Sequence, residues 1–87
     1  MKTIYKYKLL ATDTQDIELP VGAEILTVQE QFGDAVMWAL VDTNVTTETR
    51  TFQIVGTGHD ASAVDGAKYI NTFQLNSGHL VFHLFEI

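Results

Sequence analysis

The chain has 87 residues and a net charge of −6, and 46% of its residues are hydrophobic. This length and apolar content suit one folded domain, residues 1–87, with a modest core. There is no cysteine, which excludes disulfides, zinc–thiolate sites and cysteine nucleophiles and favours a cytoplasmic location. Five scattered basic residues against eleven acidic ones argue against direct nucleic-acid binding, because such a surface repels a phosphate backbone.

Membrane association is not expected either. No apolar run approaches the roughly 18–20 residues that a spanning helix needs. The segment 1–10 carries lysines but lacks an apolar stretch long enough for a signal sequence.

Short β-rich runs separated by turn signals predict an all-β, mainly antiparallel fold. We expect a small sandwich or partly open barrel of about six to seven strands with at most one short helix. The expected strands are residues 3–10, 15–19, 24–32, 35–42, 48–56, 69–75 and 79–86. Only residues 60–68 suit a helical turn, with Asp60 or Ser62 as its cap and Gly66 limiting its length.

The first predicted hairpin turns at Gly33-Asp34, because glycine at the first central position suits a two-residue type II′ turn. The resulting register gives one core face and one partly covered face. The pairs on the core face are Leu26 with Val41, Val28 with Ala39, and Glu30 with Met37. The second face carries Val36, Trp38 and Leu40 among polar neighbours.

The second predicted hairpin turns at residues 76–78, where Gly78 can supply a left-handed backbone conformation. One face of this hairpin is expected to hold Ile70, Leu80, Phe82 and Leu84. The opposite face is expected to hold Tyr69, Asn71, Phe73, His79, Val81, His83 and Phe85.

Strands with apolar residues on both faces must be covered on both sides, and one small core covers only one of them. We therefore expect a homo-oligomer that buries the remaining apolar face. The expected interface residues are Val36, Trp38, Leu40, Tyr69, Phe73, His83 and Phe85. For Trp38 and Tyr69, a place in the core of the single chain is an alternative.

The three histidines do not predict a metal site. His79 and His83 lie four residues apart on an expected strand, which separates their backbones by roughly 13 Å. Two nitrogens on one zinc ion must lie within about 4 Å of each other. His59 comes from another loop, so no metal and no cofactor are expected.

A glycine-rich loop, Gly56-Thr57-Gly58-His59, is the best candidate for contact with a ligand. Glycines allow backbone amides to approach an anion, and consecutive amides can form an anion-binding nest. The alternative is a tight bend that leaves the histidine exposed.

Arg50, the sole arginine, shares a strand face with Phe52 and could grip a small anionic ligand bidentately. Its alternative is a rim ion pair with Glu48 or Asp42.

Catalysis is not predicted. Neither serine lies in a Gly-x-Ser-x-Gly elbow. The acidic pairs Asp13/Asp16 and Asp60/Asp65 have the spacing of solvated turn residues rather than of acids projecting into one cleft.

Segments along almost the whole chain carry a resemblance to a known family. They are residues 2–7, 18–26, 38–42, 50–52, 56–59 and 79–86. These segments resemble a family of small bacteriophage and prophage proteins of unassigned function. Lys8 stands where that pattern has proline, which concerns only the end of the first strand. The resemblance carries over no catalytic residue.

The resemblance implies action on a host cell, since small acidic phage proteins often block a defence protein or sequester a nucleotide immune signal. We therefore hypothesise a non-catalytic binding protein of the host cytoplasm. Its partner would be a small anionic ligand or a host protein. A ligand would be held by the Arg50 strand and the Gly56–His59 loop. The alternative hypothesis is a small structural or assembly protein of a phage particle.

Overall fold

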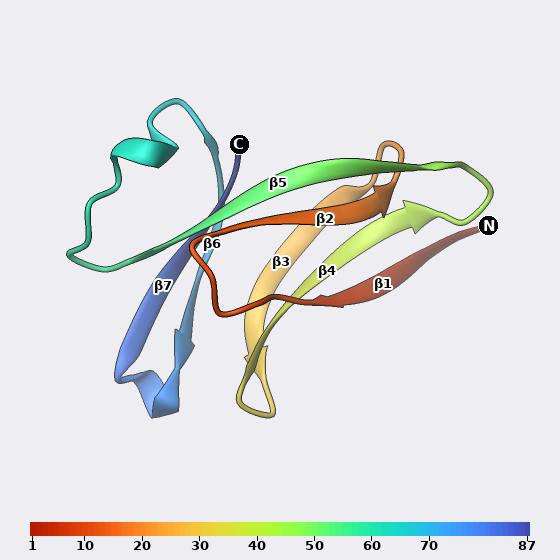
Figure 1. Cartoon of the computed structure of the whole chain (residues 1–87). Coiled ribbons are helices and arrows are strands. Elements are labelled where there is room, and N and C mark those ends of the chain that lie inside the picture. The colour runs from red at the N-terminus through yellow and green to blue at the C-terminus, as the bar shows by residue number, and fades with distance from the viewer.

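Seven strands form two antiparallel sheets in the computed structural model, which describes residues 1–87 (Figure 1). The strands and two short 3-10 turns are β1 Lys2–Lys8, β2 Thr14–Pro20, β3 Glu24–Gln31, β4 Asp34–Asp42, β5 Thr47–Gly56, η1 Ser62–Val64, β6 Lys68–Leu75, η2 Asn76–Gly78 and β7 Leu80–Glu86. The all-β prediction is confirmed, and the architecture is an open sandwich rather than a closed barrel.

The two sheets have the strand orders β1-β4-β3 and β2-β5-β7-β6. They approach each other along β3 and β6, where the Asn71 side-chain amide donates to the Thr27 hydroxyl over 2.8 Å. The strands β1 and β2 lie at the other two edges, so the connection between them crosses from one sheet to the other. The sandwich is thus joined along one side and open along the other (Figure 1).

Alternating apolar side chains of the strands face one another between the sheets. On β4 the inward positions are Met37, Ala39 and Val41, which are at most 2% exposed. The opposite sheet contributes Phe52 and Leu84, both fully buried. Together with Leu9, Leu19, Ala23, Val28 and Phe73, these residues make up a core of ten buried side chains.

The first hairpin turns one residue earlier than predicted. Phe32 and Gly33 are its central residues, with φ of 52° and 88°, and positive φ at both positions defines type I′ rather than II′. The register therefore pairs Val28 with Met37, not with Ala39. A bulge between Ile25 and Thr27 turns Leu26 outward, where it is 43% exposed.

The second hairpin turns where predicted, with positive φ at Asn76, Ser77 and Gly78. Its register differs, because four residues, not three, separate the paired Leu75 and Leu80. A bulge between Tyr69 and Asn71 changes the pairing again, so that Tyr69 pairs with Phe85. Phe73 consequently pairs with Phe82 and is 4% exposed within the core. The expectation that Phe73 belongs to an outer interface was wrong: one extra residue in a strand transfers every later side chain to the other face. Asn71 changes face for the same reason.

One end of the core is closed by an ion pair between Arg50 and Glu86. The Arg50 Nε and Nη2 atoms donate to the two Glu86 carboxylate oxygens over 2.6 and 2.8 Å. The remaining Nη1 donates to the Ala23 carbonyl over 2.6 Å. Both side chains are less than a fifth exposed, at 18% and 17%. Arg50 thus ties β5 to the last strand and to the turn before β3.

Removing the charge of Glu86 tests this closing role. We expect Glu86→Gln to lower the free energy of unfolding at pH 7 by about 1.5–3 kcal/mol, because hydrogen bonds between charged groups are lost. Urea unfolding followed by circular dichroism gives the value. The exposed Glu24, which makes no side-chain hydrogen bond or ion pair, provides the control Glu24→Gln, with an expected change below about 0.5 kcal/mol.

The same pair predicts an acid dependence. The hydrogen bonds from Arg50 hold the pKa of Glu86 below its usual range. Since the folded pKa lies below the unfolded one, the stabilisation is complete above about pH 4.3 and is lost as the pH falls through the folded pKa. The difference in stability between wild type and Glu86→Gln should narrow from about pH 4.5 downward. A constant difference down to about pH 3 would contradict the assignment.

Candidate functional site

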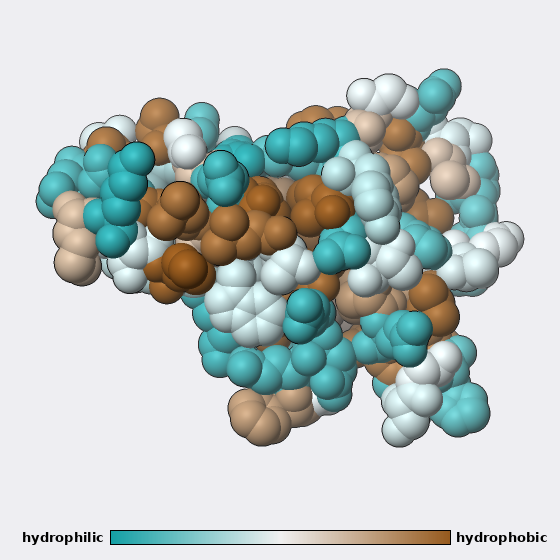
Figure 2. All heavy atoms as spheres, turned by 180° about the vertical axis from the view of Figure 1, so that it is seen from behind, coloured by the Kyte–Doolittle hydropathy of each residue, from teal (hydrophilic) through white to brown (hydrophobic).

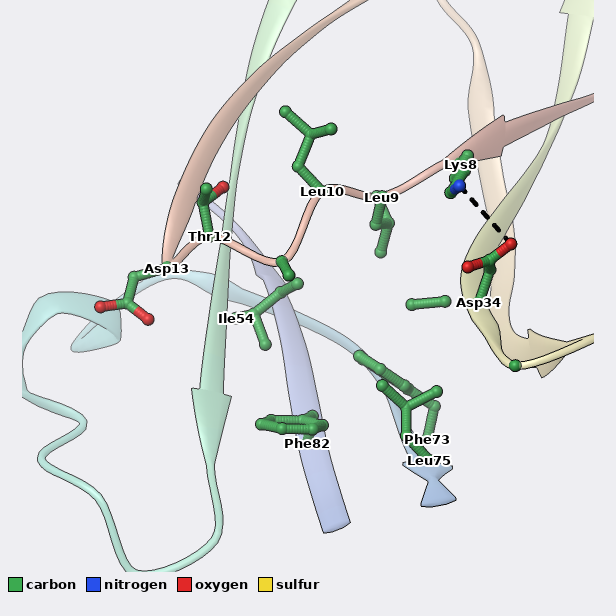
Figure 3. Close-up of a pocket in the computed structure, with 13 residues that line it drawn as sticks. Lys8, Leu9, Leu10, Thr12, Asp13, Asp34, Ile54, Phe73, Leu75 and Phe82 are labelled. Carbon is green, nitrogen blue, oxygen red and sulfur yellow. Dashed lines mark ion pairs between the residues drawn. The ribbon is translucent and has the colours of Figure 1, made fainter. Parts of the chain in front are cut away.

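At the end opposite the Arg50–Glu86 pair, the sheets separate and leave a cleft of about 470 Å³ (Figure 3). We call it the end cleft. Its walls come from the β1–β2 connection, the start of β4, the inner face of β5 and the β6–β7 hairpin. The main apolar lining residues are Leu9, Leu10, Ile54, Phe73, Leu75 and Phe82.

The β1–β2 connection is a fixed wall of this cleft. The side chain of Gln15, only 8% exposed, forms hydrogen bonds with both the amide and the carbonyl of Leu10. Its Oε1 accepts from the Leu10 amide over 2.9 Å, and its Nε2 donates to the Leu10 carbonyl over 3.0 Å. Further along, the Ile54 amide donates to the Asp13 carbonyl over 2.7 Å. The backbone is thereby held, while the Leu10 side chain stays 62% exposed at the cleft.

Carboxylates dominate the charged groups around the cleft. Lys8 forms an exposed ion pair with Asp34, with 3.5 Å between Nζ and Oδ2. Asp13 lines the cleft and also a second, smaller hollow of about 150 Å³, which Asp60 and His59 line as well. Ile54 and Phe82 line both hollows, so the two lie side by side. The three aspartates outnumber the single lysine.

The Gly56–His59 loop is a tight bend that turns on itself. The His59 amide donates to the Gly56 carbonyl over 3.1 Å, and the Thr57 amide donates to Val81 over 3.0 Å. The His59 ring covers Gly56 so closely that a Cβ there would lie 2.9 Å from Nδ1. Two of the amides of the expected anion nest are therefore used within the chain. Hydrogen bonds from the hydroxyl and amide of Ser62 lower the pKa of Asp60, which keeps this rim anionic.

The expected ligand residues do not come together. Phe52 is fully buried in the core, and Arg50 binds Glu86 rather than Glu48 or Asp42. Gly56 follows Arg50 by six positions, which span about 20 Å on an extended strand. The Gly56–His59 loop lies at the end of the molecule away from Arg50. Gly56 and His59 of this loop line the small hollow.

The expected interface residues divide between two surfaces. Val36, Trp38 and Leu40 lie on the outer face of β4, where Val36 is only 4% exposed because Lys8 and Gln29 flank it in the sheet. Val36 is therefore already buried by residues of its own chain, without a second copy. Seen from behind (Figure 2), apolar atoms gather in a band bordered by hydrophilic side chains.

The other expected interface residues lie on the outer face of β6 and β7. The Tyr69 ring packs edge-on against Phe85, with 5.6 Å between centroids. A chain of hydrogen bonds crosses the same face: Tyr69 to Thr72 over 2.7 Å, Thr72 to His83 Nδ1 over 2.9 Å, and His83 Nε2 to Thr57 over 2.8 Å. His83 is thus fully engaged within the chain.

Sequence reasoning missed the cleft and two exposed side chains beside it. Leu10 was assigned to the first strand, yet it follows the end of β1 at Lys8. Phe32 was assigned to the third strand, yet it is 94% exposed at the hairpin tip. The dipeptide Phe32-Gly33 could have indicated a type I′ turn, since glycine is preferred at its second central position.

A protein-family comparison matches the whole chain, residues 1–87, to a family described as "Domain of unknown function (DUF7352)". The chain belongs to this family. Comparisons of the chain with the curated proteins and with the solved structures found no match. The structure has no helix with the length and apolar character needed to cross a membrane. No three histidine or acidic side chains gather in a group that could hold a metal ion.

Two glycine substitutions test the geometry of the small hollow. In Gly56→Ala the new methyl group should push the His59 ring aside, because it would lie 2.9 Å from Nδ1. The free energy of unfolding should change by less than about 0.5 kcal/mol, since the ring can rotate away. The His59 ring signals in a ¹H–¹³C NMR spectrum should move.

Gly58→Ala is the matched control. Gly58 has a φ of 84° and open space around it, so alanine should cost about 1 kcal/mol through backbone strain. It should leave the His59 ring signals in place. Unmoved His59 signals in Gly56→Ala would show that the ring does not cover Gly56.

Proposed function

We propose that this protein is a non-catalytic binding domain that holds an apolar group of a partner protein in its end cleft. The observation that carries the proposal is the cleft itself, about 470 Å³ with eight hydrophobic lining residues. Concave, largely preformed apolar sites with a few polar groups are where proteins bind ligands. The buried Gln15 side chain holds one wall in place, which lowers the entropy cost of binding.

The charges around the cleft favour a neutral or cationic ligand over a nucleotide. Asp13, Asp34 and Asp60 border the two hollows, and the chain carries a net charge of −6. Its only arginine is engaged by Glu86 and Ala23. Of the two forms of the binding hypothesis, sequestration of a nucleotide signal and inhibition of a host protein, this arrangement supports the second.

The nearest approach to catalytic geometry lies elsewhere. Thr57 and His83 have the spacing of a nucleophile and its base, 2.8 Å. However, His83 is oriented by the hydroxyl of Thr72 rather than by a carboxylate, and neither residue lines the end cleft or the small hollow. A nucleophile needs an activating base and a site that holds its substrate, so we favour binding over turnover.

The resemblance to phage proteins suggests the setting for this activity. A phage-encoded domain of this kind would act in the host cytoplasm, as an inhibitor of a defence protein. The alternative role, a component of the phage particle, would use the same cleft to hold a repeated partner. Co-purification with particles would favour the alternative, and early expression without incorporation would favour the inhibitor.

Titration followed by ¹H–¹⁵N NMR tests the class of ligand. The probes are cyclic nucleotides, ADP-ribose and a short peptide with one leucine or phenylalanine flanked by lysines. We expect the peptide to shift the amide signals of Leu10, Ala35 and Leu75, which line the cleft. We expect the nucleotides to shift none of these, because the rim is anionic. Signals of Gly56–His59 that move with nucleotides alone would overturn the proposal.

Leu10→Asp provides the matched variant. Its side chain is 62% exposed, so the fold should tolerate it. In about 0.5 M salt, which screens the attraction between the new carboxylate and the flanking lysines, a charge in the cleft wall should weaken peptide binding at least about tenfold. Val45, 40% exposed in the loop at the other end of β4, gives the control Val45→Asp. Equal affinity for both variants would locate the peptide outside the end cleft.

A further inference from the structure

The tip of the β3–β4 hairpin carries an aromatic residue that is both exposed to solvent and held in an unfavourable backbone conformation. Phe32 is 94% exposed, more than any other large hydrophobic residue of the chain. Its φ of 52° lies in the left-handed region, which is disfavoured for bulky side chains. Asparagine, aspartate or glycine would suit this type I′ position. A strained and exposed phenylalanine is an outlier from which a functional role can be inferred.

Phe32 projects beside the end cleft. The residues that follow it, Gly33, Asp34 and Ala35, line the cleft, so the hairpin tip forms part of its border (Figure 3). Its ring does not enter the cleft of its own chain, since it is 94% exposed. One end of the molecule therefore carries both an apolar protrusion and an apolar hollow. A two-fold interface requires such self-complementarity, because each patch must contact its own copy.

We propose that two copies of the chain associate through this end, with the Phe32 ring of each entering the end cleft of the other. The cleft volume of about 470 Å³ falls within the range of sites that enclose drug-sized ligands, so one aromatic ring fits. The partner copy thereby supplies the apolar group that the cleft lacks in the single chain.

The charges at this end make a two-fold contact dependent on salt. Lys8 already pairs with Asp34 of its own chain, with 3.5 Å between Nζ and Oδ2, and the aspartates at the two hollows outnumber it. The net charge of −6 on each copy opposes association at low salt. At physiological salt the Debye length is about 8 Å, so the repulsion between distant charges is screened. Association should therefore strengthen as salt is added.

The dimer is expected to be weak. Two phenylalanine rings bury about 300–500 Å², and the cleft walls add a similar area. The total of about 600–1,000 Å² lies below the roughly 1,200 Å² of stable interfaces and in the range of weak, transient ones. This inference rests on the proposed function in one respect, that the end cleft accepts apolar groups. Its consequence is regulatory: self-association covers the cleft, and a partner protein must displace Phe32 to bind.

Sedimentation velocity of the full chain, from about 10 µM to 0.5 mM, tests the association. We expect a concentration-dependent dimer in wild type that strengthens between about 0.05 and 0.5 M salt. Phe32→Asn should abolish it and also raise the melting temperature by a few degrees, because asparagine suits the turn. A wild type that stays monomeric throughout, or a Phe32→Asn variant that dimerises like wild type, would overturn the inference.

A mixing experiment tests reciprocity. Phe32→Asn lacks the protrusion but keeps the cleft, whereas Leu10→Asp keeps the protrusion but has a charged cleft wall. Neither should self-associate, yet an equimolar mixture should form a heterodimer, weaker than the wild-type dimer, through one remaining contact. Isotope-filtered NOEs between the Phe32 ring of one copy and Leu75 of another would locate that contact. No heterodimer in the mixture would contradict the reciprocal geometry.

Other occupants give distinct outcomes. Binding of wild type but not Phe32→Asn to phosphatidylcholine vesicles, without self-association, would assign the tip to a lipid surface and overturn the inference. A wild-type monomer that still binds the lysine-flanked peptide would refute the dimer and leave the proposed function standing. A wild-type dimer together with a Phe32→Asn monomer that does not bind the peptide would refute the proposed function and leave the dimer standing.

Discussion

The inner faces of the two sheets meet over a core of ten buried side chains, and the other features of the molecule depend on where that core ends. At one end the Arg50–Glu86 pair and the Ala23 carbonyl close the space between the sheets. At the other end the β6–β7 hairpin separates from the start of β4 and no side chain fills the gap. A chain of 87 residues buries only a limited apolar surface, and here eight hydrophobic residues are left lining the end cleft.

The closed end also determines the chemistry of the open one. Arg50 is the only side chain able to grip an anion with a planar fork of donors, and Glu86 and Ala23 use that fork. What remains near the cleft is a set of aspartates with Lys8 and His59. A structural ion pair at one end of the core thus makes the opposite end unfavourable for phosphate groups. The proposed preference for neutral or cationic partners rests on this distribution of charges.

Two side chains at the open end remain exposed against the general tendency of folding. Leu10 is kept at the surface because the buried Gln15 bonds the Leu10 backbone on both sides. Phe32 is kept there by a turn whose left-handed conformation suits smaller residues. The hydroxyl chain from Tyr69 to Thr57, by contrast, is satisfied within its own sheet. The open end therefore combines an apolar cleft with two exposed apolar side chains, those of Leu10 and Phe32.

The sequence by itself determined the strands, their order along the chain and the all-β class, because period-two alternation and turn residues are local signals. It also located both hairpins to within one residue. Only the tertiary structure decided the two bulges at Leu26 and Ile70, which leave no distinct local signal and which each transfer later side chains to the other face. Phe73 entered the core for this reason. Arg50 found its partner 36 residues away, and the end cleft joins segments from both sheets. Such contacts depend on how the sheets pack, which neighbouring residues do not encode.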